Sequence, residues 1–132
     1  MSLLELKNLT VIRKNGIIPV IPFLPIKEKI LGKTYTLTII FCTPKESRER
    51  NKTYRKKDYP TNILSFPLSK TEGEIYISLV TAKKDAKNFE MSYQKFLNLL
   101  IIHGILHLKG MAHGSTMEEL EEKYLNHFFR GT

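Results

Sequence analysis

Residues 103–113 read HGILHLKGMAH and contain three of the four histidines of the chain. His103 and His107 are four residues apart, so they lie one above the other on a single face of a helix. Two imidazoles so placed can share one zinc ion at Zn–N distances of about 2.0–2.1 Å. Gly110 permits a left-handed turn after the helix, which brings His113 back as a third ligand. We therefore predict a zinc site that holds one ion per chain.

Three nitrogen ligands leave the fourth tetrahedral position for water, which is typical of a catalytic zinc. The alternative is that the histidines are only packed and hydrogen-bonded. The third histidine favours the metal, because three buried imidazoles would each need a polar partner in an apolar surrounding. Metzincin proteases share this spacing, but they carry a glutamate after the first histidine as general base. Gly104 stands there in this chain and cannot accept a proton, which disfavours a peptidase.

Outward from this stretch, hydrophobic periodicity predicts one α+β domain over residues 1–132. We expect about four strands and four or five helices, the most apolar helix being the one that carries the histidines. Thr116 and Glu119 form a capping-box pattern that should open the last helix. The predicted strands are residues 3–6, 35–42, 61–67 and 74–79, and the other predicted helices are residues 25–32, 43–55 and 82–89.

The net charge of +8, from 21 Lys and Arg against 13 Asp and Glu, favours a polyanionic partner such as RNA. Its distribution is uneven. Residues 45–57 hold seven basic and two acidic side chains, whereas residues 114–132 hold four glutamates and two basic side chains. One face could therefore meet phosphates, although a solvated basic surface is the commoner reading of such a run.

Cys42 is the one cysteine of the chain and falls in a predicted strand, so we expect a small buried hydrophobe. A single cysteine excludes an internal disulfide and a cysteine-rich zinc finger. No apolar run approaches the roughly 20 residues that a membrane span needs. The first residues also lack the pattern of a signal peptide. We expect a cytoplasmic protein with no membrane partner.

A second informative stretch, residues 51–67, reads NKTYRKKDYPTNILSFP. It begins at a basic helix end, which leads into a tight turn and then a strand. Arg55 has a planar fork that suits phosphate oxygens, and Lys56 and Lys57 add point charges. These three residues are our candidates for RNA binding. The structural alternative is that Arg55 pairs with Asp58 to fix the turn.

The two stretches resemble signatures of the bacterial YbeY family of ribosomal-RNA maturation endoribonucleases. The histidine stretch resembles the first signature, residues 51–66 the second and residues 73–78 the third, in the family's order. The resemblance implies zinc on the three histidines and a functional arginine at Arg55, which we take as catalytic through stabilisation of the transition state. It also implies a mixed four-stranded sheet packed by about five helices, with a zincin-like metal helix and turn.

The resemblance further implies zinc-dependent, single-strand-specific RNA cleavage in 16S rRNA 3′-end maturation and ribosome quality control, with the small ribosomal subunit as a partner. Two positions depart from the family. Met111 and Ala112 stand where Tyr-Asp is usual, so no carboxylate precedes His113, and Glu74 replaces an aspartate. Two alternatives stay open: a metal-dependent hydrolase of another substrate, and a non-catalytic ribosome-assembly factor.

Overall fold

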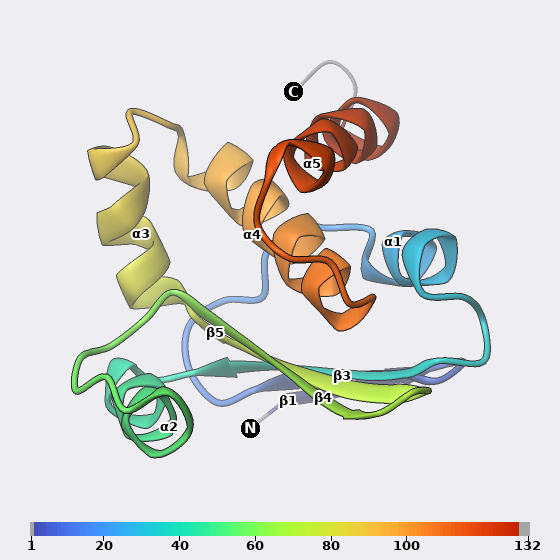
Figure 1. The fold of residues 1–132 in the computed structure, drawn as a ribbon. Helices are drawn as coiled ribbons and strands as arrows, with labels where there is room; N and C mark the ends of the chain where they lie inside the picture. Colours follow the sequence, from blue (N-terminus) through green and yellow to red (C-terminus); the bar gives the residue numbers. More distant parts are fainter. Residues whose placement is uncertain (1, 130–132) are drawn as a thin grey trace.

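A mixed sheet of five strands forms the centre of the computed structural model, which describes residues 2–129 (Figure 1). The strand order is β1-β2-β3-β5-β4. The inner pairs β2–β3 and β3–β5 are parallel, and the edge strands β1 and β4 are antiparallel to their neighbours. Residue 1 and residues 130–132 of the predicted domain lie outside the described residues. The strands are β1 Ser2–Leu6, β2 Leu9–Arg13, β3 Thr36–Cys42, β4 Ile63–Ser69 and β5 Glu72–Ser78.

The α+β class and the mixed sheet are confirmed, but the predicted count of four strands is wrong. The strand that the sequence did not reveal is β2, which pairs with β1 through a tight turn and with β3 in parallel. The turn consists of Lys7 and Asn8, both at positive φ (35° and 68°). Because neither residue is glycine, the turn lacks the usual signal of a hairpin, and only the strand over residues 3–6 was predicted in this part of the chain.

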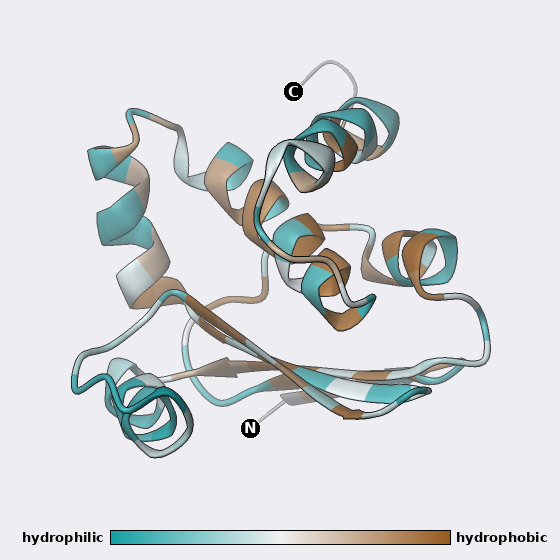
Figure 2. Ribbon diagram, viewed as in Figure 1, coloured by the Kyte–Doolittle hydropathy of each residue, from teal (hydrophilic) through white to brown (hydrophobic). Residues whose placement is uncertain are grey.

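Four of the five helices cover one face of the sheet, and α2 covers part of the other face (Figure 1). Apolar residues line the surfaces where the four helices and the sheet face each other, which is where the main core lies (Figure 2). No helix within residues 2–129 combines the length and the apolar character that a membrane crossing requires. The helices are α1 Phe23–Ile30, α2 Pro44–Arg55, α3 Leu79–Asn88, α4 Tyr93–Leu108 and α5 Ser115–Phe128.

The helix α4 is the central helix of the covering layer and carries two of the histidines. Ser92 caps its first turn by accepting a hydrogen bond from the backbone N–H of Lys95 at 3.2 Å. Ten of its sixteen residues are buried, because it contacts the sheet as well as the helices α1, α3 and α5. A helix enclosed in this way is held firmly, which suits a segment that has to position ligands.

The helix α5 follows the histidine loop and packs against α4 through its buried Met117. The prediction that Thr116 and Glu119 form a capping box at the start of this helix is wrong. The helix begins at Ser115, its N-cap is Gly114, and no side chain caps it. Thr116 is therefore already inside the first turn.

A smaller apolar cluster lies on the other face of the sheet, where α2 packs against β4 and β5. Cys42 belongs to it and is 1% exposed, so the predicted buried hydrophobe is confirmed. Arg50 of α2 lies over the ring of Tyr76, 3.9 Å from its centroid. This packing fixes α2 and therefore the position at which its last residue, Arg55, leaves the helix.

Candidate metal centre and nucleic-acid interface

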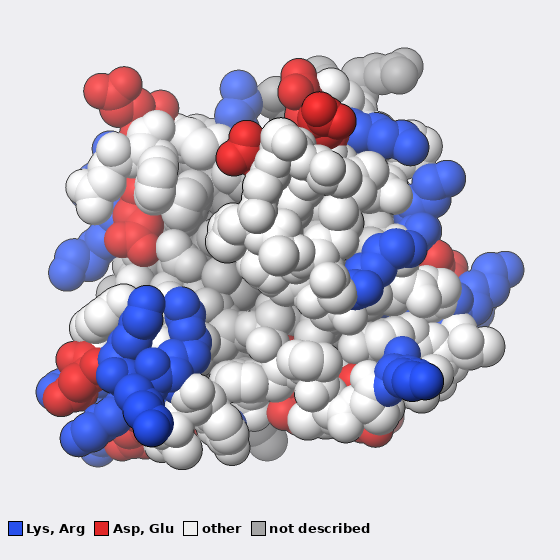
Figure 3. Space-filling view, in the orientation of Figure 1, with Lys and Arg blue, Asp and Glu red and all other residues white. Residues whose placement is uncertain are grey.

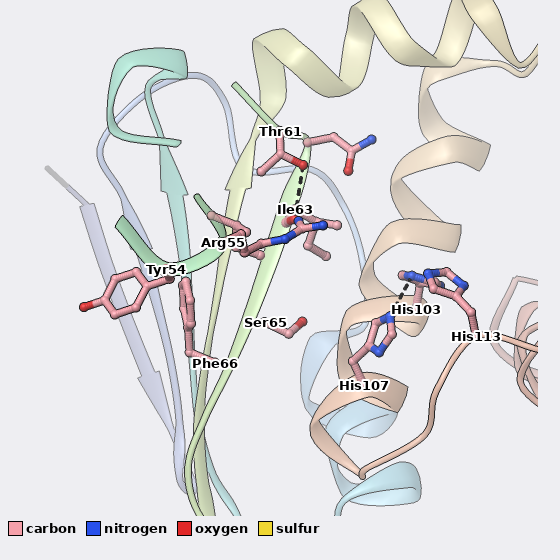
Figure 4. A pocket seen from close by; sticks show the side chains of 11 residues that line it. Tyr54, Arg55, Thr61, Ile63, Ser65, Phe66, His103, His107 and His113 are labelled. Carbon is pink, nitrogen blue, oxygen red and sulfur yellow. Dashed lines mark hydrogen bonds between the residues drawn. The ribbon is translucent and has the colours of Figure 1, made fainter. Parts of the chain in front are cut away.

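The three histidines meet at the end of α4 and in the loop that follows it (Figure 4). His103 and His107 extend from the last turns of the helix. Gly110 has a φ of +100°, the left-handed conformation that the sequence predicted, and the loop then places His113 beside the other two. One ring nitrogen from each histidine can be chosen so that all three lie within 4.8 Å of one another. The structure thus brings together all three predicted ligands.

The hydrogen-bond partners of two histidines determine which ring nitrogen carries the proton. His107 Nδ1 faces the carbonyl oxygen of Met111 at 3.0 Å, and a carbonyl can only accept. His103 Nδ1 faces a carboxylate oxygen of Glu121 at 2.5 Å. Both Nδ1 atoms therefore donate, and in the neutral rings both Nε2 atoms carry lone pairs. These two Nε2 atoms face each other at 3.0 Å, an arrangement that a proton or a metal cation between them stabilises.

This donor set fits zinc. A tetrahedral zinc ion with Zn–N distances of about 2.0–2.1 Å holds its ligand nitrogens roughly 3.3 Å apart. The Nε2 atoms of His103 and His107 are close to that separation, and His113 lies within reach of both. Within residues 2–129, no aspartate, glutamate or cysteine joins the three imidazoles as a fourth member of the group. Three neutral nitrogen donors in this arrangement match the open type of zinc site.

The histidines differ in burial. Burial lowers the pKa of His107 below its usual value, and the neighbouring His103 lowers it further. A lowered pKa keeps the His107 imidazole neutral, which is the form that binds a metal ion. His103 is half-buried like His107, but His113 is exposed. The expectation of three buried imidazoles is therefore wrong: the third ligand lies in a loop whose outer side faces solvent.

Gly104 lies where α4 comes closest to β4. A Cβ atom at this position would stand 2.7 Å from Ile63 Cδ1 and 3.1 Å from Ser65 Oγ. The Ser65 hydroxyl also donates a hydrogen bond to the Gly104 carbonyl at 3.0 Å, which links the helix to the strand. A Cβ atom here would have to push aside the end of the Ile63 side chain and would crowd the Ser65 hydroxyl. Glycine at this position therefore has a packing reason, since it allows the close contact between α4 and β4.

A cavity of about 700 Å³ opens in front of the histidines. The histidines line one side of it, and the end of α2 with the first half of β4 lines the other (Figure 4). Segments that are far apart in the sequence therefore face each other across one space. The lining residues are Tyr54, Arg55, Thr61, Asn62, Ile63, Leu64, Ser65, Phe66, His103, His107 and His113.

Arg55 is the last residue of α2 and lines the cavity opposite the histidines (Figure 4). Its position is fixed by the helix and by the turn that follows. Asn51 is buried and donates a hydrogen bond to the carbonyl of Tyr59 at 2.9 Å, and Ser47 donates one to the carbonyl of Thr61 at 2.6 Å. Within residues 2–129, Arg55 makes no ion pair and no side-chain hydrogen bond. Its guanidinium is available to a ligand.

The predicted structural partner of Arg55 is engaged elsewhere. Asp58 accepts a hydrogen bond from Arg48 Nε at 2.7 Å, and Lys52 Nζ lies 4.0 Å from its other oxygen. The hydrogen bond from Arg48 lowers the pKa of the Asp58 carboxyl below its usual value and raises the pKa of the Arg48 guanidinium. The alternative in which Arg55 pairs with Asp58 is therefore wrong.

Lys56 and Lys57 extend the basic surface at the end of α2. Lys56 adopts a left-handed conformation (φ 57°) that ends the helix, and both side chains are exposed. Lys and Arg side chains gather over α2, and acidic ones lie over α5 (Figure 3). The uneven charge distribution of the sequence is thus confirmed as a spatial separation, with the basic part beside the cavity.

Two features of the site were not evident from the sequence. Tyr54, 62% exposed, packs against Phe66 with the ring centroids 4.9 Å apart, and the two rings form an aromatic ledge on the side away from the Arg55 guanidinium (Figure 4). Glu121 contacts His103 from α5. The sequence did contain a hint of the first feature, because the aromatic Tyr54 immediately precedes the basic residues 55–57. The Glu121 contact joins residues 18 positions apart, which no helical spacing relates.

Comparison with known proteins agrees with this arrangement. The sequence model of the family described as Endoribonuclease YbeY matches residues 14–128. The protein named Endoribonuclease YbeY from Aster yellows witches'-broom phytoplasma is 38% identical over 117 residues, covering 78% of this chain and 77% of the relative. The protein of the same name from Aquifex aeolicus is 42% identical over 94 residues, covering 67% of this chain and 62% of the relative.

A solved structure shares the fold. The solution structure of TM1509 from Thermotoga maritima superposes with a TM-score of 0.58 at 30% sequence identity. The superposition covers 81% of this chain and 79% of that chain. The family match spans both the arginine and the histidine side of the cavity. On the sequence match, the curated relatives and the shared fold, the chain belongs to the YbeY family.

Proposed function

We propose that this protein is a zinc-dependent endoribonuclease that cleaves single-stranded RNA. One observation carries the proposal: three imidazoles that can share an ion face an unpaired arginine across a single cavity. The relatives that match most of the chain are named endoribonucleases, which supports RNA as the substrate. The net charge of +8 and the basic surface beside the cavity favour the same polyanion.

In this proposal His103, His107 and His113 hold the metal, with their Nε2 or other free ring nitrogens as ligands. When bound, zinc supplies Lewis acidity toward water and toward a phosphoryl oxygen. Arg55 donates hydrogen bonds to the non-bridging phosphate oxygens, whose negative charge grows as the phosphorus becomes five-coordinate. Lys56 and Lys57 bind the neighbouring phosphates and hold the strand in place.

The aromatic ledge gives the proposal its preference for single strands. Unpaired bases can stack on an exposed aromatic ring, whereas the bases of a duplex are already stacked and enclosed. Tyr54 is among the residues that line the cavity, and its exposed ring points away from the Arg55 guanidinium (Figure 4), so a base stacked on it would belong to a nucleotide next to the one whose phosphate meets Arg55. Stacking of this kind is insensitive to sequence, because every base has a flat face.

We place the activity in 16S rRNA 3′-end maturation and ribosome quality control, with the small ribosomal subunit as partner and the cytoplasm as the site of action. The support is the family to which the chain belongs and the basic face that would meet a ribosomal surface. Two alternatives make different predictions. A metal-dependent hydrolase of another substrate would not cleave rRNA, and an assembly factor would bind rRNA without cutting it.

The test is cleavage of a single-stranded RNA that spans the 3′ end of 16S rRNA, with the same sequence annealed to a complement as control. We expect cutting of the single strand alone, its loss on chelation and its return with added zinc. Peptide libraries should stay intact, since Gly104 beside His103 offers no carboxylate to serve as the base of a protease. Tight RNA binding without cleavage by the zinc-loaded protein would favour the assembly factor instead.

A further inference from the structure

Glu121 reaches the histidine group from a helix outside the stretch that carries it. It lies in the second turn of α5, and its Oε2 accepts a hydrogen bond from His103 Nδ1 at 2.5 Å. The side chains of His103 and Glu121 are only 18% and 12% exposed to solvent. A carboxylate that meets an imidazole N–H in a largely enclosed place makes a strong, charge-assisted hydrogen bond.

We propose that Glu121 is a positioning residue of the metal site, which holds the His103 ring in the tautomer and orientation that present Nε2 to the ion. The inference rests on the proposed metal site, since Glu121 acts through a ligand and does not touch the metal position. The physical reason is general: an imidazole that donates its second N–H to a carboxylate is a more basic ligand and loses less freedom on binding.

The three other glutamates of α5 do not take part. Glu118, Glu119 and Glu122 are exposed, and none of them contacts a histidine. Glu121 differs because it lies four residues after Met117, which is 1% exposed and anchors the helix in the core. Residues four apart share a helical face, so the packing of Met117 directs Glu121 toward α4. The contact is a consequence of how α5 docks.

The two helical ligands are oriented by different means. His107 is held by the backbone carbonyl of Met111, which every residue at that position would supply. Ala112, beside the third ligand, has no carboxylate to offer. His103 is thus the ligand whose orientation depends on the identity of a side chain, and that side chain comes from α5. The affinity of the site for metal should therefore depend on Glu121.

The test compares zinc affinity, measured by competition with a chromophoric chelator, in the wild-type protein, Glu121→Ala, Glu121→Gln and the control Glu122→Gln. Glu122 is exposed on the same helix, so its variant removes one negative charge nearby without removing the contact. We expect zinc to bind Glu121→Ala roughly 10 to 100 times more weakly than wild type. Glu121→Gln should lie in between, because its amide oxygen still accepts the Nδ1 hydrogen bond but carries no charge.

A second readout separates positioning from simple stabilisation. Cobalt(II) bound in place of zinc should show an altered visible spectrum in Glu121→Ala and an unchanged one in Glu122→Gln. Equal zinc affinities in all four proteins would overturn the inference, as would a lower melting temperature of metal-free Glu121→Ala with unaltered zinc binding. A wild-type protein that binds zinc but leaves RNA uncut would contradict the proposed nuclease and not the role of Glu121. A wild-type protein that binds no zinc would overturn both.

Discussion

Asp58 is bound by Arg48 and not by Arg55: Arg48 Nε donates to Asp58 Oδ1 at 2.7 Å, from about two turns before Arg55 in the first half of α2. Arg48 is therefore the arginine that binds the turn before the strand β4. Arg55, at the end of the same helix, keeps its guanidinium for the cavity. Two arginines of one basic helix thus have different surroundings, and the role proposed for each can be tested by itself.

The first prediction concerns the titration of Asp58. The hydrogen bond from Arg48 lowers the pKa of this carboxyl, so Arg48→Ala should raise it toward its usual value and Arg55→Ala should leave it unchanged. A lowered pKa means that the pair stabilises the fold above the usual carboxyl pKa and that this contribution is lost as the pH falls through the lowered value. Carbon-detected NMR of the Asp58 carboxyl measures both variants. A changed pKa of Asp58 in Arg55→Ala would instead support an ion pair between Arg55 and Asp58.

The second prediction concerns the role of Arg55 in cleavage. Arg55→Ala should lower the maximal single-turnover rate by roughly two to three orders of magnitude, the scale for losing one donor to a transition-state oxyanion. Zinc content and melting temperature should hardly change, because Arg55 has no partner within residues 2–129. Arg55→Lys should recover little, since lysine keeps the charge without the planar fork. A full maximal rate at saturating RNA would make Arg55 a binding residue only.

The third prediction concerns the basic surface. RNA binding should weaken with salt, and each phosphate contact on a single strand contributes about 0.7 to the log–log slope. Lys56→Ala and Lys57→Ala should each reduce the slope by about that amount while the maximal cleavage rate stays the same. Lys29→Ala, on the exposed side of α1, is the matched control and should leave the slope as it is. Equal slopes in all of these proteins would remove the two lysines from the interface.

The fourth prediction concerns the contact between α4 and β4. Gly104→Ala adds a methyl group 2.7 Å from Ile63 Cδ1, and such overpacking costs about 1–3 kcal/mol. Alanine gains up to about 1 kcal/mol of helix propensity, so the free energy of unfolding should still fall. Ile63→Val removes the Cδ1 atom and should recover part of the loss in the double variant. Denaturant unfolding of the four proteins measures the coupling, and strictly additive effects would contradict the close contact.

The fifth prediction concerns Cys42. Burial raises the pKa of its thiol to about 11, with a smaller contribution from Glu46, and the side chain is 1% exposed. At about pH 8 the group should stay a thiol, which is a poor nucleophile. Ellman's reagent should therefore leave the native protein unmodified and react with one thiol per chain in denaturant. Rapid reaction of the native protein would show that the apolar cluster under α2 opens easily.

The local parts of this fold were readable from the sequence because local chemistry determines them. Thr43 accepts the backbone N–H of Glu46 at 3.1 Å, and Gly110 takes the left-handed conformation, as their residue types predicted. The last helix was misread at Thr116, because a capping box needs the chain to leave the helix there. The helix instead begins at Ser115, with Gly114 as its N-cap and no side-chain cap.

The long-range parts of the site were not readable. The three histidines lie within eleven residues, so helix geometry relates His103 to His107 and the turn at Gly110 relates both to His113. Glu121 meets His103 only because α5 folds back along α4, and Arg55 faces the histidines only because α2 ends and β4 begins beside them. Such pairings depend on how layers pack, and a single sequence carries no spacing rule for that. The resemblance to the YbeY family pointed to Arg55 as a functional residue, but it did not point to Glu121.

The division of the cavity between two parts of the chain has a consequence for protein synthesis. The ribosome makes Arg55 and its sheet first, and the helix α4 and the loop with His113 later. A nascent chain that has only the earlier part would have the proposed phosphate-binding groups but not the histidines proposed to hold an ion. A cutting enzyme whose substrate is the RNA of the ribosome would thus emerge beside that RNA in an inert form. The chain would become able to cleave RNA only after the histidine loop has left the exit tunnel and α5 has packed against α4.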